Sequence, residues 1–294
     1  MSWWPEPRST ATKLGAFVVA LGVVFAGAYG VGAIARPGAA SDPGHDAPGG
    51  HTEEHAGDAG GGSGPGGLAV ASEGYALRAV GAGPAAGVPG EFAFQIVNVH
   101  EHPVTGFQLN HEKRLHLIVV RRDLTGFQHL HPQMDADGTW RSPLTVPAAG
   151  DWRVFADFRP DGHEQSVVLG MDVPVGGDYV PQPLPEPKAS TMVDGYTVTV
   201  AGQLAAGRTS RLTLAVSKDG APVTNLQPYL GAYGHLVALR AGDLAYLHVH
   251  PQETMSSGPE ITFDVEVPTQ GAYRLFLDFQ HDGVVRTAVW TATA

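Results

Sequence analysis

Histidines stand in two matched sets along this sequence. The first set is His116, His129 and His131, and the second is His235, His248 and His250. In each set the last two alternate around one apolar residue, so in an extended strand their side chains leave the same face. A third imidazole from a neighbouring strand would complete a site for Cu(II) or Zn(II), because neutral imidazole suits both ions and three protein ligands leave a position open. We expect these six residues to bind a metal, with copper preferred and zinc as the alternative.

Two carboxylates and one further histidine are also candidate ligands. Asp157 and Asp278 fall at equivalent strand ends, where each could be a fourth ligand or orient a ligating imidazole. His281 belongs to the second set alone and either extends a site or lies in a loop. The sequence contains no cysteine, which excludes thiolate copper centres, iron–sulfur clusters and disulfides.

A competing interpretation makes these histidines structural. His116 and His235 would then be core residues with satisfied hydrogen bonds, and the His-x-His-Pro segments would be turns. Both sets persist although much of the two surrounding segments has diverged. A buried polar group without a partner costs about 1 to 3 kcal/mol, so drift to apolar residues should have been easy without a role. This retention favours metal binding.

An internal duplication carries the two sets. Residues 103–105 recur at 222–224, and His-Leu-His-Pro-Gln at 129–133 recurs as His-Val-His-Pro-Gln at 248–252, a shift of 119 positions. Residues 150–158 recur at 271–279, a shift of 121 positions. Short β-branched or aromatic runs between turn residues predict an antiparallel sandwich of seven or eight strands in each copy. In the first copy the expected strands are Tyr75 to Val80, Glu91 to Val97, Arg114 to Arg121, Thr139 to Val146, Trp152 to Phe158 and Gln165 to Val173.

Local signals support this all-β reading. Asp161-Gly162 and Asp282-Gly283 are typical hairpin turns. Trp152 and Tyr273 each follow a Pro-x-x-Gly turn and resemble the aromatic corner of immunoglobulin-like domains. We therefore expect tandem immunoglobulin-like sandwiches over residues 68–178 and 190–294, joined by a stiff proline-rich spacer at 179–189.

The N-terminal part predicts a membrane anchor and a tether. Residues 14–35 form 22 uncharged, largely apolar positions, long enough to cross a bilayer as a helix. Arg8 and Lys13 precede this run and an acidic stretch follows it, which places residues 1–36 as a cytoplasmic end plus a single transmembrane helix with all later residues outside the cytoplasm. The alternative is a signal peptide cleaved after Ala35, giving a secreted protein. Residues 37–67 are rich in Gly, Pro, Asp and His and are expected to be a disordered linker.

Composition and motifs exclude several function classes. The net charge is −11 and no basic cluster is present, so nucleic acid is not an expected partner. His-Glu-x-x-His, Gly-x-Ser-x-Gly and phosphate-binding glycine loops are all missing, and nothing supplies an obvious general base beside a metal-bound water. We do not expect an enzyme.

One segment carries a resemblance to a known family. Pro147 to Trp152, followed by Asp161-Gly162-His163, resembles the last strands of CopC-like periplasmic copper-binding domains. The resemblance implies an immunoglobulin-like sandwich that handles copper, with Asp161 and His163 as copper ligands. The whole chain also resembles secreted, heavy-metal-binding proteins of high-GC bacteria.

Together these observations predict a membrane-anchored extracytoplasmic protein that binds copper or zinc for capture, delivery or sensing. A metal transporter or another metalloprotein would be its partner. The alternative from another class is a structural or protein-interaction module of two immunoglobulin-like domains without a metal. Whether the two histidine sets form one shared site or two separate sites is left open by the sequence.

Overall fold

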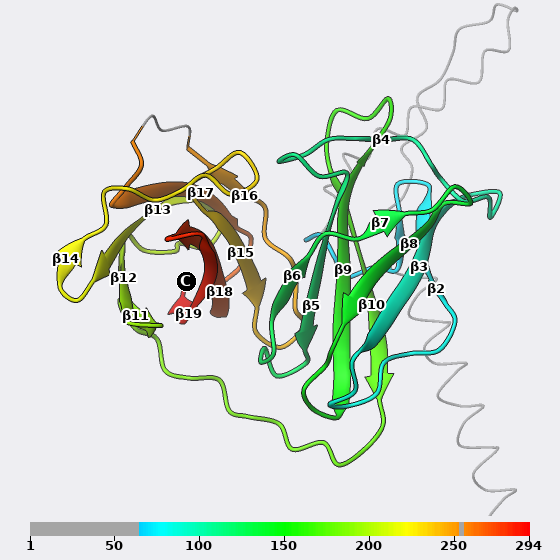
Figure 1. The fold of residues 1–294 in the computed structure, drawn as a ribbon, viewed down its shortest axis with the longest axis horizontal. Coiled ribbons are helices and arrows are strands. Elements are labelled where there is room, and N and C mark those ends of the chain that lie inside the picture. The colour runs from blue at the N-terminus through cyan, green and yellow to red at the C-terminus, as the bar shows by residue number, and fades with distance from the viewer. Residues whose placement is uncertain (1–64, 253–255) are drawn as a thin grey trace, which may run out of the picture. The chain divides into compact units, whose positions relative to one another are not determined.

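The structure, a computed structural model, describes residues 65–252 and 256–294. These residues form strands β1 to β19, which pair in antiparallel sheets (Figure 1). The predicted membrane segment at 14–35 and nearly all of the predicted linker lie outside them. Within the described ranges, no helix has the length and hydrophobicity needed to cross a bilayer.

The first sandwich is built from two sheets. One has the order β1 (Ala71–Ser72), β2 (Tyr75–Val80), β3 (Gly90–Asn98), β8 (Thr139–Leu144) and β7 (Gln133–Met134). The other has the order β10 (Val167–Val175), β9 (Gly150–Pro160), β5 (Leu115–Arg121) and β6 (Gln128–Leu130), with β4 (Phe107–Gln108) paired to β9.

The second sandwich repeats this plan in its long strands and differs in its short ones. Its first sheet has the order β11 (Ser190–Val193), β12 (Tyr196–Ala201), β13 (Arg208–Lys218), β17 (Glu260–Val267) and β16 (Val249–Pro251), with β14 (Ala221–Pro222) paired to β13. Its second sheet has the order β15 (His235–Arg240), β18 (Ala272–His281) and β19 (Val284–Thr293). The segment equivalent to β6, which forms β16, therefore belongs to the first sheet and not to the second. This pairing determines where His248 and His250 lie.

All six strands expected in the first copy are present, with ends displaced by at most two residues. The predicted hairpins are confirmed as well, since Asp161-Gly162 begins the loop from β9 to β10 and Asp282-Gly283 joins β18 directly to β19. Asp282 and Gly283 both have positive φ, which is the conformation of a type I′ turn. The tandem antiparallel sandwich fold predicted from the sequence is thus confirmed, but the copies contain β1 to β10 and β11 to β19 where seven or eight strands each were expected, because short edge strands add to the long ones.

The aromatic corner is formed in both copies by side chains of different chemistry. Trp152 Nε1 donates to the carbonyl oxygen of Ala148 at 3.0 Å, and Tyr273 Oη donates to that of Thr269 at 2.6 Å. In both cases the acceptor lies four residues upstream. The corner thus fixes the turn before β9 and before β18, the two strands that carry Asp157 and Asp278.

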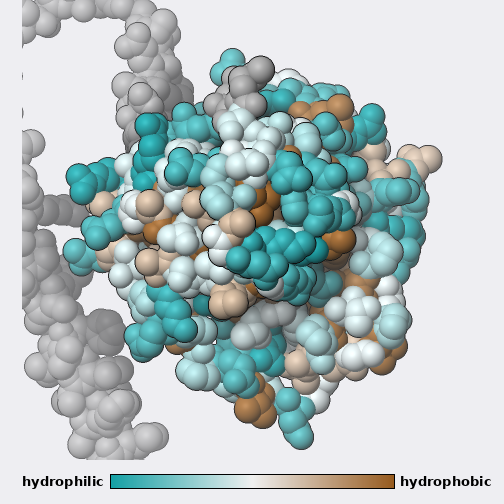
Figure 2. Space-filling view, turned by 60° about the vertical axis from the view of Figure 1, so that its left-hand side comes forward, coloured by the Kyte–Doolittle hydropathy of each residue, from teal (hydrophilic) through white to brown (hydrophobic). Residues whose placement is uncertain are grey.

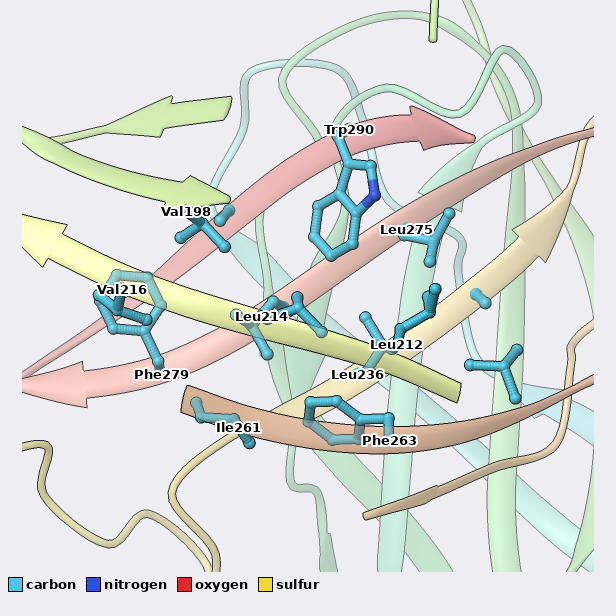
Figure 3. Packing of buried hydrophobic residues seen from close by; sticks show 14 of the residues in the cluster. Val198, Leu212, Leu214, Val216, Leu236, Ile261, Phe263, Leu275, Phe279 and Trp290 are labelled. Atoms are coloured by element: carbon cyan, nitrogen blue, oxygen red, sulfur yellow. The ribbon is translucent and has the colours of Figure 1, made fainter. Parts of the chain in front are cut away.

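Each sandwich has its own hydrophobic core. In the second sandwich, Leu214 on β13 and Phe263 on β17 pack toward Leu275 on β18 and Trp290 on β19 (Figure 3). Alternation of buried and exposed positions along β13 and β17 gives each strand one core face and one polar face. The face of the molecule shown in Figure 2 is accordingly mostly hydrophilic, with hydrophobic side chains in small separate groups.

A third apolar cluster joins the two sandwiches, which belong to one compact unit. Its buried members are Ile118, Val120, Leu124 and Phe155 from the first copy and Val237, Leu239, Leu244 and Phe276 from the second. Ile118, Val120 and Phe155 occupy the same repeat positions as Val237, Leu239 and Phe276. Equivalent patches therefore face each other, as in the self-complementary interface of a twofold dimer.

We expect Leu214→Ala to lower the free energy of unfolding by about 2 to 5 kcal/mol, because this fully buried side chain would leave a cavity in the second core. Urea unfolding followed by tryptophan fluorescence would measure the loss. Met192→Ala is the control, since Met192 is 75% exposed and its truncation should change stability by about 0.5 kcal/mol or less. Equal effects of the two substitutions would contradict this assignment of the core.

Candidate metal centre

The two strand histidines are held in the same way in both copies. His116 on β5 and His235 on β15 are buried, and each points one ring nitrogen at a backbone carbonyl six residues upstream. His116 Nε2 lies 3.0 Å from the oxygen of Asn110, and His235 Nε2 lies 2.7 Å from that of Tyr229. A carbonyl can only accept, so Nε2 carries the proton in both rings and Nδ1 keeps a lone pair. Both histidines are therefore preset to offer Nδ1.

His129 on β6 connects the two sandwiches. Its Nδ1 lies 2.8 Å from Asp278 Oδ2 on β18, and the two side chains are only 7% and 5% exposed. Asp278 Oδ1 also accepts a hydrogen bond from Thr287 Oγ1 at 2.5 Å, which fixes the carboxylate. On its other side, His129 Nε2 lies 2.9 Å from Nδ1 of His116.

The hydrogen bonds of His116 and His129 require one further positive charge between the two rings. His129 must donate from Nδ1 to the Asp278 carboxylate, and His116 must donate from Nε2 to Asn110. If His129 is neutral, its Nε2 lone pair then faces the Nδ1 lone pair of His116 at 2.9 Å. A positive centre has to lie between these nitrogens, and it is either a second proton on His129 or a metal ion.

His131 supplies a third nitrogen at the same place. Its ring centroid is 4.8 Å from that of His129 and 5.1 Å from that of His116. One ring nitrogen from each of these three histidines lies within 4.8 Å of the others. His131 Nε2 is buried and has no hydrogen-bond partner among the described residues, which is costly for a polar atom unless something binds it.

A small cavity of about 80 Å³ adjoins the rings of His116 and His129. Its polar lining consists of Asn110, His111, His116, His129, Asp157, His235 and Tyr246. Its apolar lining includes Val249, Pro251 and Phe263. The cavity therefore draws side chains from both sandwiches and has room for an ion and its remaining ligands.

Asp157 lies in this cavity without the partner that its counterpart has. It faces His116 across β5 and β9, as Asp278 faces His235 across β15 and β18. Asp278 binds His129, whereas Asp157 Oδ1 is buried with no hydrogen-bond partner among the described residues. By the symmetry of the duplication, the missing imidazole is that of His248.

His248 lies elsewhere because its segment leaves the second sheet of its sandwich one residue after Leu247 and joins the first sheet. Gln128 pairs with Val119, and the equivalent Leu247 still donates its amide to Ala238. In the first copy the pairing continues to Leu130, so His129 stays beside β5. In the second copy the His248 carbonyl accepts from Glu266 on β17 instead.

His248 and His250 consequently lie exposed on the first sheet of their sandwich. The structure brings them together with Glu266 and not with His235.

His163 and His281, the other predicted ligands, contact tyrosines. His163 Nε2 lies 2.9 Å from Tyr75 Oη, and His281 Nδ1 lies 2.7 Å from Tyr196 Oη. His281 Nε2 also contacts Asn225 Oδ1 at 3.1 Å. Neither histidine belongs to a group of three potential ligands in the described part of the chain. Asp161, implied as a ligand by the family resemblance, belongs to no such group either.

Sequence reasoning missed three contributors to this region. The carbonyls of Asn110 and Tyr229 carry no side-chain signal, although their equal spacing of six residues before His116 and His235 could have been noticed. Tyr246 enters the cavity from the loop after β15 and packs against Phe155, with ring centroids 5.6 Å apart and ring planes tilted by 50°. Burial, together with the Asp157 and Asp278 carboxylates, raises the pKa of Tyr246 well above its usual range.

Burial sets the protonation of the centre. It lowers the pKa of His116 to about 3, and it lowers the pKa of His131 and of His235 to about 4, with the positive charge of His129 adding to the effect in each case. These three imidazoles are therefore neutral at physiological pH, which is the ligating form. Burial also raises the pKa of the Asp157 carboxyl to about 6.

The fold and this centre define a class of protein: tandem immunoglobulin-like sandwiches with a histidine-rich centre between them. Residues 69–174 and 191–294 each match the family described as a domain of unknown function (DUF8832), and the chain belongs to this family. No curated protein matches the chain.

Several solved structures resemble the chain at low identity. Invasin, a bacterial integrin-binding protein, is 14% identical with a TM-score of 0.22, and the match covers 75% of this chain and 39% of invasin. The Escherichia coli adhesin FdeC is 16% identical with a TM-score of 0.26, over 75% of this chain and 62% of the adhesin. Bovine butyrophilin is 8% identical with a TM-score of 0.21, over 75% of this chain and 98% of butyrophilin. The chain thus spans less than two thirds of the first two, and likenesses this weak bear on neither function nor partners.

The metal-free protein should lose stability on acidification from about pH 7 to about pH 5. His116, His131 and His235 stay neutral when folded but bind protons below pH 6.5 when unfolded, so the unfolded state binds more protons and the free energy of unfolding falls. Asp157 acts in the opposite direction, because its raised pKa makes the folded state bind the extra proton between about pH 4 and 6.

Urea midpoints measured with a chelator present test this balance. Asp157→Asn removes the opposing contribution, so the loss of stability between the two pH values should become larger in that variant. A midpoint that does not fall on acidification would show that the imidazoles are not held neutral.

Proposed function

We propose that this chain binds one transition-metal ion between its two sandwiches, Cu(II) in preference and Zn(II) as the alternative. His116 Nδ1, His129 Nε2 and His131 Nε2 are the ligands. The observation that carries the proposal is the contact of 2.9 Å between His116 Nδ1 and His129 Nε2, where two lone pairs meet unless a cation lies between them. A metal ion there would replace a proton.

The surroundings of the three rings support this assignment. Asp278 holds His129 as a carboxylate holds a ligating imidazole in metal sites, and the Asn110 carbonyl does the same for His116. His131 Nε2, otherwise without a partner among the described residues, would gain one. Each ring would thus offer the metal a nitrogen that is not hydrogen-bonded to a carbonyl or a carboxylate.

The spacing of the nitrogens is compatible with copper. Two nitrogens bound to one ion at about 2.0 to 2.1 Å are about 2.9 Å apart if they subtend a right angle and about 3.4 Å apart in a tetrahedron. The distance of 2.9 Å between His116 Nδ1 and His129 Nε2 is compatible with the right angle that Cu(II) prefers, and it is equally the length of an ordinary hydrogen bond. His235 Nδ1 or Asp157 would complete the coordination from the cavity.

We further propose that the protein works outside the cytoplasm, held at the membrane by residues 14–35, in metal capture, delivery or sensing. A buried centre suits retention and handover, so a metal transporter or another metalloprotein would be its partner. The charge distribution around the apolar run supports this location.

A second candidate function is a structural or protein-interaction module without a metal. The specific observation in its favour is that a proton on His129 satisfies the whole chain from Asp278 to Asn110. Together with the apolar cluster, this network would then serve to hold the two sandwiches against each other. A substitution of His131 can distinguish the two candidate functions, because His131 is a ligand in the metal proposal but takes no part in this hydrogen-bond network.

The metal proposal predicts that His131→Ala lowers metal affinity without lowering stability. The tag-free full-length protein is titrated with Cu(II) and Zn(II), then dialysed against glycine to remove ions held weakly. The wild type should retain about one ion, and His131→Ala should retain none while unfolding at the wild-type urea midpoint. Asp278→Asn should weaken binding by about 10- to 100-fold, because it loosens His129.

His163→Ala is the matched control, since His163 contacts Tyr75 and should leave retention unchanged. If the wild type retains no stoichiometric metal, the metal proposal is refuted and the interaction module becomes the better account.

The anchor proposal predicts that protein recovered from the membrane fraction keeps its original N-terminus. N-terminal sequencing decides this directly. A sequence that begins at Arg36 would establish a cleaved signal peptide and a secreted protein instead.

A further inference from the structure

A second group of potential ligands lies on the surface of the second sandwich. His248, His250 and Glu266 are all exposed, and one ligand atom from each lies within 4.8 Å of the others. Two come from the segment at β16 and one from β17, two neighbouring strands of one sheet. This group shares no residue with the centre between the sandwiches.

Strand pairing holds these three side chains on one face. The Glu266 amide donates to the His248 carbonyl at 3.0 Å, which sets the two residues side by side. His250 follows two positions after His248 and so projects from the same face. The rings of His248 and His250 are 4.1 Å apart and nearly perpendicular, and His250 Nε2 is 3.9 Å from Glu266 Oε1.

The neighbouring carboxylate on this face is already engaged. Asp264, opposite His250, accepts two hydrogen bonds from Arg211 at 2.9 and 3.0 Å and one from Gln252 at 2.7 Å. Glu266, whose side chain is 57% exposed, is the carboxylate that faces the two imidazoles. Two imidazoles and one carboxylate on a face, with the remaining positions open to solvent, form a donor set for a divalent transition metal.

We propose that His248, His250 and Glu266 form a second, solvent-exposed site for a divalent transition-metal ion. Its open side makes it a site of capture and exchange, in contrast to the enclosed centre between the sandwiches. The site stands on its own residues and does not depend on the proposed function of that centre.

The test compares Cu(II) binding by full-length, tag-free variants, using isothermal titration and electron paramagnetic resonance. His250→Ala should lower the stoichiometry by about one ion relative to the wild type. Glu266→Gln should weaken that site by about tenfold or more, because the neutral amide is a poorer ligand than the carboxylate. In His129→Ala the surface site should persist, with nitrogen hyperfine structure from two imidazoles. Linker histidines are common to all variants and cancel in the differences.

His102→Ala is the matched control. His100 and His102 are also an exposed pair two residues apart, but their rings are 6.4 Å from each other and no carboxylate completes a group of three around them in the described residues. This control should bind like the wild type.

Wild-type stoichiometry and affinity in both His250→Ala and Glu266→Gln would overturn the surface site. A loss in His250→Ala without any loss in His129→Ala or His131→Ala would leave the surface site standing and refute the centre between the sandwiches.

Discussion

The contact between His129 and Asp278 is the interaction on which the rest of the centre depends. It joins residues 149 positions apart, buries a carboxylate beside an imidazole and crosses from one sandwich to the other. A buried carboxylate without a partner would be expensive, so the two sandwiches cannot separate at this point without solvating both groups. The same contact assigns the proton on His129 and thereby turns its Nε2 toward His116. The same contact therefore orients the candidate ligand His129 and holds the two sandwiches together.

The sequence predicted much of the fold because the relevant signals are local. Alternation in the strands, paired turn residues such as Asp282-Gly283 and the aromatic corners each act within a few residues, and the structure confirms them. That His116 and His129 lie close together could also be predicted from the sequence, because a short connection brings β6 back beside β5. The resulting prediction of three clustered imidazoles in the first copy agrees with their positions.

The positions of His248 and Asp157 were beyond the reach of sequence reasoning. The repeated His-x-His-Pro motif predicts equivalent sites, but whether the strand pairs with β15 or with β17 is decided by competition between two sheet edges. That competition depends on packing across the whole sandwich, and identical motifs can resolve it differently. The different position of His248 also affects Asp157. Asp157 occupies the place equivalent to that of Asp278, but no imidazole is bonded to its Oδ1 among the described residues. Tyr246 was likewise invisible, since its importance comes only from where its loop lies.

The matched apolar patches of the two copies have a consequence for assembly. Ile118 and Phe155 lie in one buried cluster with their own counterparts, Val237 and Phe276, so a single copy of this domain already carries both halves of the interface. A lone domain could bring these faces together only by dimerising, and its centre would then form and dissolve with protein concentration. In the tandem chain the spacer at 179–189 keeps the faces at a high local concentration, which makes the centre independent of dilution. Covalent linkage also releases the two copies from having to be identical, and their two His-x-His segments do differ: the second is exposed to solvent and the first is not.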